Sequence, residues 1–524
     1  MVFRSPFPDI TVPDVPVHEH VLAQAAEYGD RLALVDGAGS GTRMTYTQLV
    51  QAVRRLAAGF ASIGVRKGDV IAIFSPNTVA YPVVFYAATM AGATVTTVNA
   101  LYTAAELADQ LRDSGARYLV TISLFLDRAR EATAEAPVDE ILVCDTAEGC
   151  RSIQELMAID APAPDVEFDP AEDVAVMPYS SGTTALPKGV LLTHRNIVAN
   201  MIQTNSVLHM GEGERLVAVL PFFHIYGMAV LMNHALANGA TVVVLPRFEL
   251  EQFLDVLAEH RITRAYVAPP IVLALAKHPI VSSYDLSSLR LVLSAAAPLD
   301  PDLAEACARR IGCKVAQGYG MTELSPVCMV VPDSDDDLPA GTVGKLIAGT
   351  EGRLVDPATG ADVGVGETGE LWVRGPQVMK GYLNRPDETA NMIDEDGWLR
   401  TGDIARVDAD GNWYIVDRVK ELIKYKGYQV PPAELEAVLL THEKIADAAV
   451  IGVLDEEGNE APKAFVVPAA GAALTEDEVI AYVAERVAPH KKVRRVEFID
   501  AVPKAASGKI LRKELRAREA RVRS

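Results

Sequence analysis

The stretch that decides the fold is residues 70–98, VIAIFSPNTVAYPVVFYAATMAGATVTTV. It opens with an apolar run, Val70–Phe74, ended by Ser75-Pro76-Asn77, which predicts a buried strand and a turn. Thr78–Met90 has helical length and composition, and Ala93–Val98 is again strand-like. A strand, a helix and a strand, with β-branched residues in the strands, are typical of a mostly parallel sheet covered by helices.

The same alternation returns later in the chain. Leu216–Leu220 and Thr241–Leu245 are strand-like, and each is followed by a predicted helix, the first ending at Ala237 and the second covering Glu251–His260. Several prolines and acids lie between the two blocks, near residues 150–175. The sequence therefore predicts an α/β fold class with two α/β subdomains separated near this stretch.

The composition changes twice further along the chain. After about residue 335 it is Gly-rich with short strands such as Gly369–Val373, which predicts a small β unit near residues 335–416. From Asp417 onward short helices and strands are predicted at Glu434–Leu440, Ala448–Val453, Ala464–Val467 and Glu476–Val487. We expect an N-terminal core, residues 1–416, and a small, mobile α+β domain, residues 417–524, whose tail Lys509–Arg523 is a solvated basic helix.

The charge balance limits the classes of partner. The 524 residues include 49 Lys and Arg against 70 Asp and Glu, a formal net charge of -21. General nucleic-acid binding needs a basic surface, so this composition argues against it. A polyanionic substrate has to be attracted by local positive groups, because the field of the whole molecule repels it.

Cysteine usage and the N-terminus indicate the compartment. The five cysteines have no paired metal-ligand spacing, and an odd, sparse set is typical of a reducing environment. The first residues, MVFRSPFPDITVPDVP, hold acids and prolines where a signal peptide needs an apolar run. The chain has no uninterrupted apolar stretch of about 18 residues. We predict a cytoplasmic protein without membrane insertion and without an evident obligate protein partner.

The first segment that points to chemistry is residues 179–190, YSSGTTALPKGV. Small and hydroxylated residues, two glycines and Lys188 follow the apolar run Val174–Met177. Such a loop can direct backbone N–H groups and hydroxyls at phosphate oxygens, and the lysine adds a charge. It is not a Walker A loop, because Pro187 precedes the lysine and Gly189 follows it. A flexible surface loop is the alternative for this segment alone.

This loop resembles the phosphate-binding signature of the adenylate-forming superfamily, which contains acyl-CoA synthetases, firefly-type luciferases and peptide-synthetase adenylation domains. Further signatures follow in family order, GYGMTE at 318–323, TGD at 401–403, DRVKELIKYKG at 417–427 and SGK at 507–509. The resemblance covers essentially the whole chain. It implies adenylation of a carboxylic acid with ATP and Mg²⁺ and, for the synthetases, acyl transfer to coenzyme A. Ala185 departs from the family's usual glycine, and a positive φ there would cost about 1 kcal/mol.

The resemblance implies a set of residues for ATP and its metal ion. Thr322 would contact the α-phosphate, and Glu323 would bind magnesium, which prefers oxygen ligands beside phosphates. Asp403 would accept hydrogen bonds from the ribose, supported by Arg418. The other residues implied for ATP or AMP are Ser180, Ser181, Gly182, Thr183, Thr184, Lys188, Gln317 and Gly318. Outside the motifs, Glu323 could be a structural buried acid and residues 401–403 a simple turn.

The resemblance also implies the catalytic residues of two successive steps. Lys509 would bridge the acid and the α-phosphate, because a cation that touches both reactants gains most as charge rearranges. Asp417 would be the hinge about which the C-terminal domain swings between an adenylation pose and a thioester-forming pose. Further catalytic residues are Lys420, Lys424 and Gln429, and the coenzyme A contacts are Lys426, Gly427 and Arg247. Outside the motif order, Lys509 would be only a surface charge.

Residues 221–227, PFFHIYG, bear on the identity of the acid substrate. They resemble the acyl-pocket wall of plant-type 4-coumarate–CoA ligases, and residues 420–430 also resemble those enzymes. The implied pocket is lined by His224, Tyr226, Val230, Ala296, Gly318 and Val330, with His224 also catalytic. A lone histidine between aromatic residues is otherwise a core residue. Residues 221–232 and 293–299 contain no carboxylate, which argues against amino acid substrates because their ammonium group would be buried unpaired.

Two of these pocket residues bear on which acid is used. Val230 stands where plant hydroxycinnamate ligases often have a serine, and Val330 replaces a methionine. The less polar pocket favours cinnamate, other aryl-propenoates or a medium acyl chain over strongly hydroxylated acids. Three alternatives stay open: a medium- or long-chain fatty acyl-CoA synthetase, a stand-alone enzyme that loads a carrier protein, and a non-catalytic adenylate-binding protein. The presence of Lys509 and Glu323 argues against the last.

Overall fold

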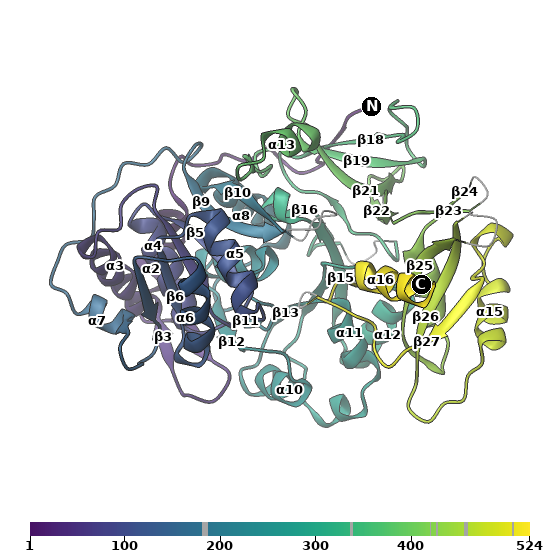
Figure 1. Cartoon of the computed structure of the whole chain (residues 1–524), viewed down its shortest axis with the longest axis horizontal. Helices are drawn as coiled ribbons and strands as arrows, with labels where there is room; N and C mark the ends of the chain where they lie inside the picture. Colours follow the sequence, from purple (N-terminus) through teal and green to yellow (C-terminus); the bar gives the residue numbers. More distant parts are fainter. Residues whose placement is uncertain are drawn as a thin grey trace.

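The computed structural model describes residues 1–180, 187–335, 339–419, 421–425, 428–454, 460–505 and 508–523. Within these ranges the strands form two large α/β sheets, an antiparallel sheet, a hairpin and a small C-terminal sheet (Figure 1). The predicted α/β class is confirmed. None of the helices in the described ranges is long and apolar enough to cross a membrane.

Residues 70–98 form the centre of the first α/β sheet, as predicted. Strands β4 (Val70–Phe74) and β5 (Thr94–Val98) pair in parallel, and helix α4 (Ala80–Met90) connects them. Helix α4 has no charged residue and is buried almost throughout, as expected for a helix that is apolar on every side. The sheet order is β20-β10-β9-β5-β4-β6-β7-β8.

The other strands of this sheet are β6 (Tyr118–Thr121), β7 (Glu140–Val143), β8 (Arg151–Ser152), β9 (Val174–Ser180), β10 (Lys188–Thr193) and β20 (Gly381–Tyr382). Pairing is parallel from β9 to β8, whereas β10 pairs antiparallel with both β9 and β20. The remaining helices of this region are α3 (Tyr46–Ser62), α5 (Ala104–Ser114), η1 (Ser123–Phe125), α6 (Leu126–Glu135) and α7 (Ile153–Met157).

The second α/β sheet has the order β17-β16-β15-β14-β13-β11-β12-β2-β3 and is parallel from β15 to β2. Its strands are β2 (Leu32–Asp36), β3 (Arg43–Thr45), β11 (Arg215–Ala218), β12 (Thr241–Val244), β13 (Arg264–Val267), β14 (Leu291–Ser294), β15 (Lys314–Gly320), β16 (Val327–Val330) and β17 (Lys345–Leu346). The helices around it are α1 (Val17–Leu22), α2 (Ala25–Tyr28), α8 (His194–Leu208), α10 (Leu250–Glu259), α11 (Pro269–Lys277), η3 (Pro279–Ser283), α12 (Pro301–Ile311) and η4 (Thr322–Leu324).

Two details of this region differ from the sequence-based expectation. The helix expected up to Ala237 is a π-helix, η2 (Tyr226–His234), followed by a single turn, α9 (Ala235–Ala237). The two sheets are also not divided near residues 150–175, since β9 and β10 follow that stretch yet complete the first sheet. Strands β2 and β3 instead join the edge of the second sheet. These pairings connect distant segments, so local composition does not reveal them.

The predicted β unit is an antiparallel sheet of order β1-β18-β19-β21-β22. Its strands are β1 (Phe3–Arg4), β18 (Glu351–Val355), β19 (Thr368–Arg374), β21 (Leu399–Val407) and β22 (Trp413–Arg418), and helix α13 (Pro386–Met392) lies beside them. Strand β1 comes from the N-terminus and was not expected. The Phe3 ring packs edge-on against Trp413, with 5.5 Å between the ring centroids, which anchors the N-terminus to this sheet.

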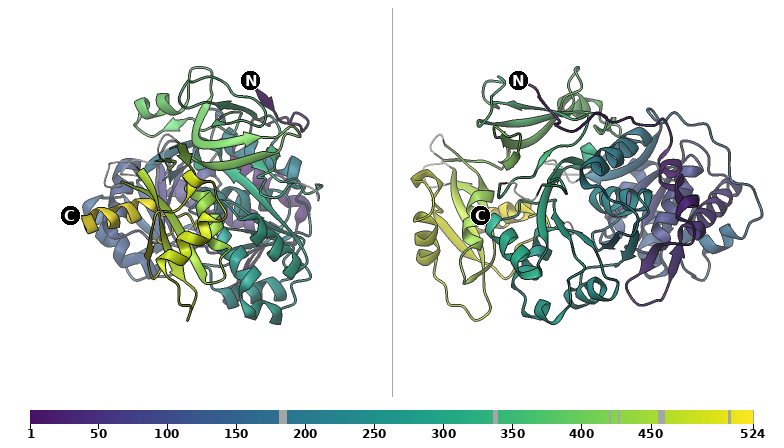
Figure 2. Two further views of the ribbon diagram at one scale, coloured as in Figure 1. Left: turned by 90° about the vertical axis from the view of Figure 1, so that its right-hand side faces the viewer. Right: turned by 180° about the vertical axis from the view of Figure 1, so that it is seen from behind.

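The C-terminal region forms its own apolar core (yellow in Figures 1 and 2). Its strands are β23 (Ile423–Tyr425), β24 (Tyr428–Val430), β25 (Ile445–Leu454), β26 (Glu460–Pro468) and β27 (Arg495–Phe498). Its helices are α14 (Pro432–Leu440), α15 (Glu476–Ala484), η5 (Pro489–Lys491) and α16 (Arg512–Arg523). The expected boundary at residue 417 stays a prediction.

The basic tail is not only a solvated helix, which corrects that expectation. In α16 the side chain of Leu515 is 2% exposed and packs into the C-terminal core. Arg512 donates to both carboxylate oxygens of Glu436, at 2.7 and 2.6 Å. The charge count of the tail did not reveal these contacts, because it does not show which residues face the C-terminal core.

Candidate active site

A cavity of about 610 Å³ lies at the carboxyl ends of strands from both α/β sheets. Its walls include Thr97 at the end of β5, Ser180 at the end of β9, Ala295 after β14, and Gly318 in the last residues of β15. Ligands of open α/β sheets bind at these strand ends, where loops replace the regular ladder. The two sheets therefore supply one shared site.

One wall of the cavity is built around the buried carboxylate of Glu323. Its Oε1 accepts hydrogen bonds from Ser180 Oγ at 3.0 Å and from the hydroxyl of Tyr382 at 2.9 Å. Burial and this carboxylate raise the pKa of Tyr382, so its hydroxyl stays a donor. Lys188 lies 5.0 Å from the centre of the Tyr382 ring and pairs with Glu388. The ammonium group of Lys188 and the carboxylates of Glu323 and Glu388 thus lie on the same wall of the cavity.

These groups fit a magnesium ion held jointly with phosphates. Magnesium is usually bound through one or two carboxylates plus substrate phosphates, because it gives up its water reluctantly. Glu323 provides a carboxylate, and the neighbouring hydroxyl of Ser180 provides a further oxygen. In the described part of the chain no group of three or more His, Cys, Asp or Glu is placed to hold a metal by itself. The donor set therefore suits an ion that arrives with a nucleotide.

A second acidic group, Asp403, is held at the edge of the cavity by two donors. The hydroxyl of Tyr319 donates to Oδ2 at 2.6 Å, and Arg418 Nε lies 3.1 Å from Oδ1. Burial raises the pKa of Tyr319, and the adjacent carboxylate raises it further. Tyr319 and Arg418 line the cavity, and the Asp403 side chain is 5% exposed. This preorganised acceptor has the chemistry that a sugar hydroxyl needs.

Lys509 enters the cavity from a loop that precedes α16. Gly508 has a φ of +82°, and a Cβ there would lie 3.3 Å from both Ala268 and Pro270 at the start of α11. A glycine allows both the turn and this close approach. Burial, with a smaller contribution from nearby Arg418, lowers the pKa of Lys509 to about 8. The loop thus delivers an ammonium group whose charge is sensitive to what fills the cavity.

His224 lies between β11 and the π-helix η2, and it lines the same cavity. Its Nδ1 accepts the backbone N–H of Tyr226 at 3.2 Å. Burial lowers its pKa to about 4, with a smaller contribution from Lys509, so the imidazole is neutral at pH 7. A Cβ on Gly227 would lie 2.1 Å from the carbonyl oxygen of Pro221. This turn therefore requires glycine.

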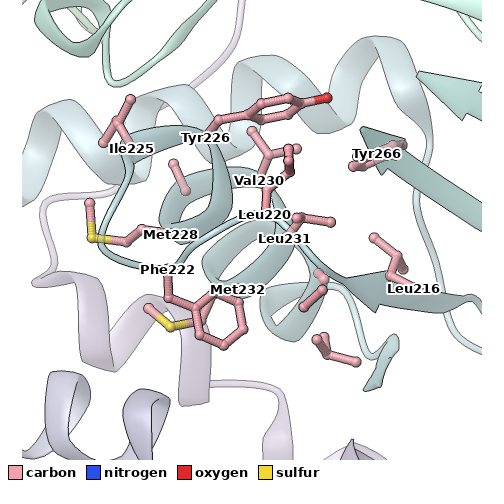
Figure 3. Close-up of a cluster of buried hydrophobic side chains, with 14 of the residues drawn as sticks. Leu216, Leu220, Phe222, Ile225, Tyr226, Met228, Val230, Leu231, Met232 and Tyr266 are labelled. Carbon is pink, nitrogen blue, oxygen red and sulfur yellow. The ribbon is translucent and has the colours of Figure 1, made fainter. Parts of the chain in front are cut away.

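The predicted acyl pocket is an apolar part of this cavity. Figure 3 shows Tyr226 and Val230 on one side of η2, whereas Met228 and Met232 lie on the other side among buried side chains. A π-helix widens the turn, and such segments are frequent at functional sites. Val230 is 2% exposed. The residues predicted for this pocket all line the cavity: His224, Tyr226, Val230, Ala296, Gly318 and Val330.

Two backbone positions shape the same wall. Ala296 has a φ of +74°, a left-handed conformation that is strained for a residue with a Cβ. A Cβ on Gly318 would lie 3.3 Å from the carbonyl oxygen of Met329 and 3.6 Å from the side chain of Val330. Glycine at position 318 leaves that space to a ligand.

The predicted hinge residue, Asp417, joins β22 to the C-terminal region. Its carboxylate accepts the backbone N–H of Arg418 at 2.7 Å and that of Ala433, in the first turn of α14, at 3.0 Å. Burial raises the pKa of Asp417. A carboxylate at a helix N-terminus is favourably placed toward the helix dipole. Movement about this residue stays a prediction.

Some predicted site residues lie outside the cavity or outside the described residues. Gln317 Oε1 accepts the N–H of Leu299 at 3.1 Å, and the exposed Arg247 pairs with Glu249 at 2.5 Å. Lys424 is exposed on β23, in register with Gln429 of β24. Gln317, Arg247 and Lys424 are not among the described residues that line the cavity. The side chain of Gln429 and the residues Ser181, Gly182, Thr183, Thr184, Ala185, Lys420, Lys426 and Gly427 lie outside the described part.

Tyr319, Tyr382 and Glu388 are among the cavity residues that sequence reasoning missed. Tyr319 lies inside the GYGMTE motif, so its hydroxyl could have been proposed as a partner of a nearby acid. Tyr382 and Glu388 carry no local signal, because β20 and α13 reach the site only through the pairing of β20 with β10. Long-range strand pairing cannot be read from one sequence.

Comparison with known proteins agrees with this geometry. Residues 21–383 match the family of AMP-binding enzymes, and residues 434–509 match the AMP-binding enzyme C-terminal domain. The chain is 41% identical to 4-coumarate–CoA ligase 1 of Petroselinum crispum, covering 99% of this chain and 97% of that one. It is 44% identical to 4-coumarate–CoA ligase 2 of Oryza sativa subsp. japonica, covering 99% and 95%.

Solved structures of acid–CoA ligases also resemble this chain over nearly its whole length. The anthranilate CoA ligase AuaEII, solved with anthranoyl-AMP, has a TM-score of 0.89 at 26% identity and covers 97% of this chain and 98% of that one. A benzoate CoA ligase from Burkholderia xenovorans LB400 has a TM-score of 0.87 at 28% identity, covering 96% and 100%. From its sequence, its fold and the residues gathered in its cavity, the chain belongs to the adenylate-forming AMP-binding enzyme family.

Proposed function

We propose that the protein is an acid–thiol ligase that converts an aryl-propenoic acid, ATP and coenzyme A into the acyl-CoA thioester, AMP and diphosphate. The observation that carries the proposal is one cavity in which Lys509, Thr322 and Glu323 lie beside an apolar pocket on η2. The 4-coumarate–CoA ligases at 41% to 44% identity support the same chemistry. Both substrates of the first step would then meet within a single site.

In the first step the carboxylate of the acid attacks the α-phosphorus of ATP. The bond to the bridging oxygen breaks, diphosphate leaves, and the acyl-adenylate forms. Two anions must approach each other, so positioning and charge neutralisation dominate catalysis. We assign Lys509 to the carboxylate and α-phosphate, Thr322 to the α-phosphate, Lys188 to the outer phosphates, and Asp403 to the ribose hydroxyls. Bound Mg²⁺ would neutralise phosphate charge, with Glu323 among its ligands.

In the second step the thiolate sulfur of coenzyme A attacks the acyl carbon, and AMP leaves. Neutral His224 beside the acyl group can orient this carbon without adding a second cation. A swing about Asp417 would withdraw Lys509 and present the face that carries Lys424. We assign Lys420 and Gln429 to catalysis and Lys426, Gly427 and Arg247 to coenzyme A on the strength of the family resemblance.

The apolar lining of η2 favours cinnamate and 4-coumarate over acids with several hydroxyl groups. A buried hydroxyl without a partner costs about 1–3 kcal/mol, and Val230 and Val330 offer no hydrogen bond. A preference for caffeate over cinnamate would contradict this part of the proposal. A medium- or long-chain fatty acid remains the second candidate substrate, because the same apolar wall accepts an alkyl chain.

The reaction as proposed needs no protein partner, and we place it in the cytoplasm. The five cysteines are free, including the buried Cys144, Cys307 and Cys328. Free, sparse thiols are typical of a reducing compartment.

Product analysis tests the proposal. Purified protein is incubated with Mg-ATP and cinnamate, 4-coumarate, caffeate, benzoate, octanoate or palmitate, each with and without coenzyme A. We expect AMP and a cinnamoyl- or coumaroyl-CoA mass. Dominance of octanoate or palmitate would remove the aromatic assignment and leave the two-step mechanism, whereas ADP as product would overturn adenylation itself.

A further inference from the structure

The backbone segment that leads to His224 is held from the first α/β sheet. Residues 218–224 begin at the last residue of β11, in the second sheet, and end at His224, which lines the cavity. After Ala218 the segment belongs to no strand. Within the described part of the chain, the side-chain hydrogen bonds that reach it from other elements come from Asn77 and Thr97. Both residues lie toward the carboxyl ends of strands of the first sheet, Asn77 after β4 and Thr97 in β5.

Asn77 uses both ends of its amide group on this segment. Its Nδ2 donates to the carbonyl oxygens of Ala218 at 3.2 Å and Leu220 at 2.9 Å, and its Oδ1 accepts the N–H of Phe222 at 2.7 Å. The asparagine is 4% exposed and is not among the described residues that line the cavity. An asparagine amide offers donors and an acceptor together, so it can replace a neighbouring strand for backbone that has left its sheet.

Thr97 holds the residue immediately before His224. Its hydroxyl donates to the carbonyl oxygen of Phe223 at 2.8 Å, and the threonine is 3% exposed. The preceding residue, Phe222, is fully buried and packs against Tyr81 of α4, with 5.6 Å between the ring centroids. Figure 3 shows the Phe222 ring on the buried side of η2. Positions 222 and 223 are therefore fixed to the first sheet, directly before the histidine.

The histidine ring is oriented by the turn that follows. Its Nδ1 accepts the backbone N–H of Tyr226, which places the proton of the neutral ring on Nε2. The location of that Nε2–H group depends on this bond and on where the backbone of His224 lies. The bond is local to the turn, whereas the location of the backbone depends on Asn77 and Thr97.

We propose that Asn77 and Thr97 are positioning residues that hold His224 against the acyl group during thioester formation. This inference rests on the proposed function and gives the first sheet a part in a step assigned to the wall of the second. Holding the histidine matters because a shift of about 1 Å in a catalytic group can lower a rate by about 10²-fold. Residues 75–77, SPN, which end strand β4, thereby also serve the active site.

The test measures thioester formation from synthetic cinnamoyl-adenylate and coenzyme A, and adenylation as diphosphate release without coenzyme A. We expect Thr97→Val to slow thioester formation about tenfold and to leave adenylation within about threefold of the unsubstituted rate. Thr97→Ser keeps the hydroxyl and should preserve both rates within about threefold. Asn77→Ala should slow the same step by at least as much. It removes more hydrogen bonds, so Thr97→Val carries the test if Asn77→Ala does not fold.

A double-mutant cycle separates positioning from other effects, because Thr97 itself lines the cavity. His224→Ala should slow thioester formation about 10²-fold. In that background Thr97→Val should have less than about a twofold further effect, since the group it positions is gone.

The matched control is Thr94→Val. Thr94 begins β5, at the opposite end of the strand from Thr97, and its hydroxyl donates to the carbonyl oxygen of Val174 at 2.8 Å. Its substitution should change neither rate. An unchanged rate of thioester formation in a folded Thr97→Val variant would overturn the inference. A tenfold effect that persists without the imidazole, or an equal effect of Thr94→Val, would overturn it too. The proposed function is judged separately, since it fails if the unsubstituted enzyme yields no AMP and thioester from any acid.

Discussion

Replacing Lys509 by methionine should slow adenylation strongly and spare thioester formation. Methionine keeps the length and apolar stem of the side chain but removes the ammonium group. In the described structure this group enters the cavity on the loop that Gly508 allows, next to Arg418. Only the first step is proposed to need a cation between carboxylate and phosphate, so the two half-reactions should separate.

The magnitude follows from the surroundings of the lysine. Burial, with help from Arg418, lowers its pKa from 10.5 to about 8, which corresponds to about 3 kcal/mol against the charged form in the empty cavity. The phosphates and the carboxylate of the substrates restore that charge as they bind. Losing one preorganised donor of this kind typically lowers a rate by about 10²–10³-fold. We expect the adenylation rate of Lys509→Met to fall by that factor.

The assay follows each half-reaction separately. Diphosphate release without coenzyme A reports adenylation, and mixing synthetic cinnamoyl-adenylate with coenzyme A reports thioester formation. The rate of thioester formation should stay within about threefold of that of the unsubstituted enzyme. A threefold change corresponds to only about 0.7 kcal/mol of activation free energy. Lys513→Met is the matched control, since Lys513 is an exposed lysine of α16 outside the cavity. It should change neither rate.

The pH dependence adds an independent check. The ammonium form of Lys509 is lost as the pH rises through about 8, so kcat/KM for ATP should fall above that pH. Arginine stays charged throughout this range, so Lys509→Arg should lack the falling limb, whatever its absolute rate. The reasoning is refuted if Lys509→Met adenylates at the normal rate, or if both half-reactions fall by the same factor.

Three further predictions follow from the site and the core. Asp403→Asn should raise KM for ATP about tenfold and leave KM for the acid unchanged in steady-state kinetics, because it weakens a ribose acceptor. Gly227→Ala should lower the free energy of unfolding by about 1–3 kcal/mol in urea, since its Cβ would lie 2.1 Å from a carbonyl oxygen; Gly211→Ala, with no atom within 4 Å of the new Cβ, should not. Burial lowers the pKa of His194 to about 4, so its stabilising effect is complete above pH 6.5 and is lost as the pH falls toward 4. The free energy of unfolding in urea should therefore drop between pH 6.5 and pH 5, and His194→Gln should make this drop smaller by up to about 2 kcal/mol. A drop of the same size in the variant would contradict this assignment.

The sequence predicted the elements whose residues interact locally. Val70–Phe74 is a strand because its apolar run has strand length and a Ser-Pro-Asn stop, and α4 follows because the next residues have helical composition. The order of the family motifs predicted that Thr322, Glu323 and Lys509 share one site, and all three line the cavity. Their individual roles stay proposals.

What the sequence could not predict depends on contacts across the chain. Strand β1 forms only because β18 offers an edge, and Tyr382 reaches Glu323 only through the pairing of β20 with β10. The register of η2 as a π-helix depends on how it packs against neighbouring elements, not on its composition.

The loop that carries Lys509 has a consequence for the working cycle. Gly508 in this loop lies near Ala268 and Pro270 of the N-terminal core and has no side chain to pack against them. The lowered pKa means that the ammonium group is better solvated outside the cavity than inside it. In the absence of nucleotide, both features reduce what holds the loop in the cavity. If the domain turns as predicted, bound ATP would hold the loop in the cavity through Lys509, and release of diphosphate would weaken that hold, so the chemical step would set the time of the turn.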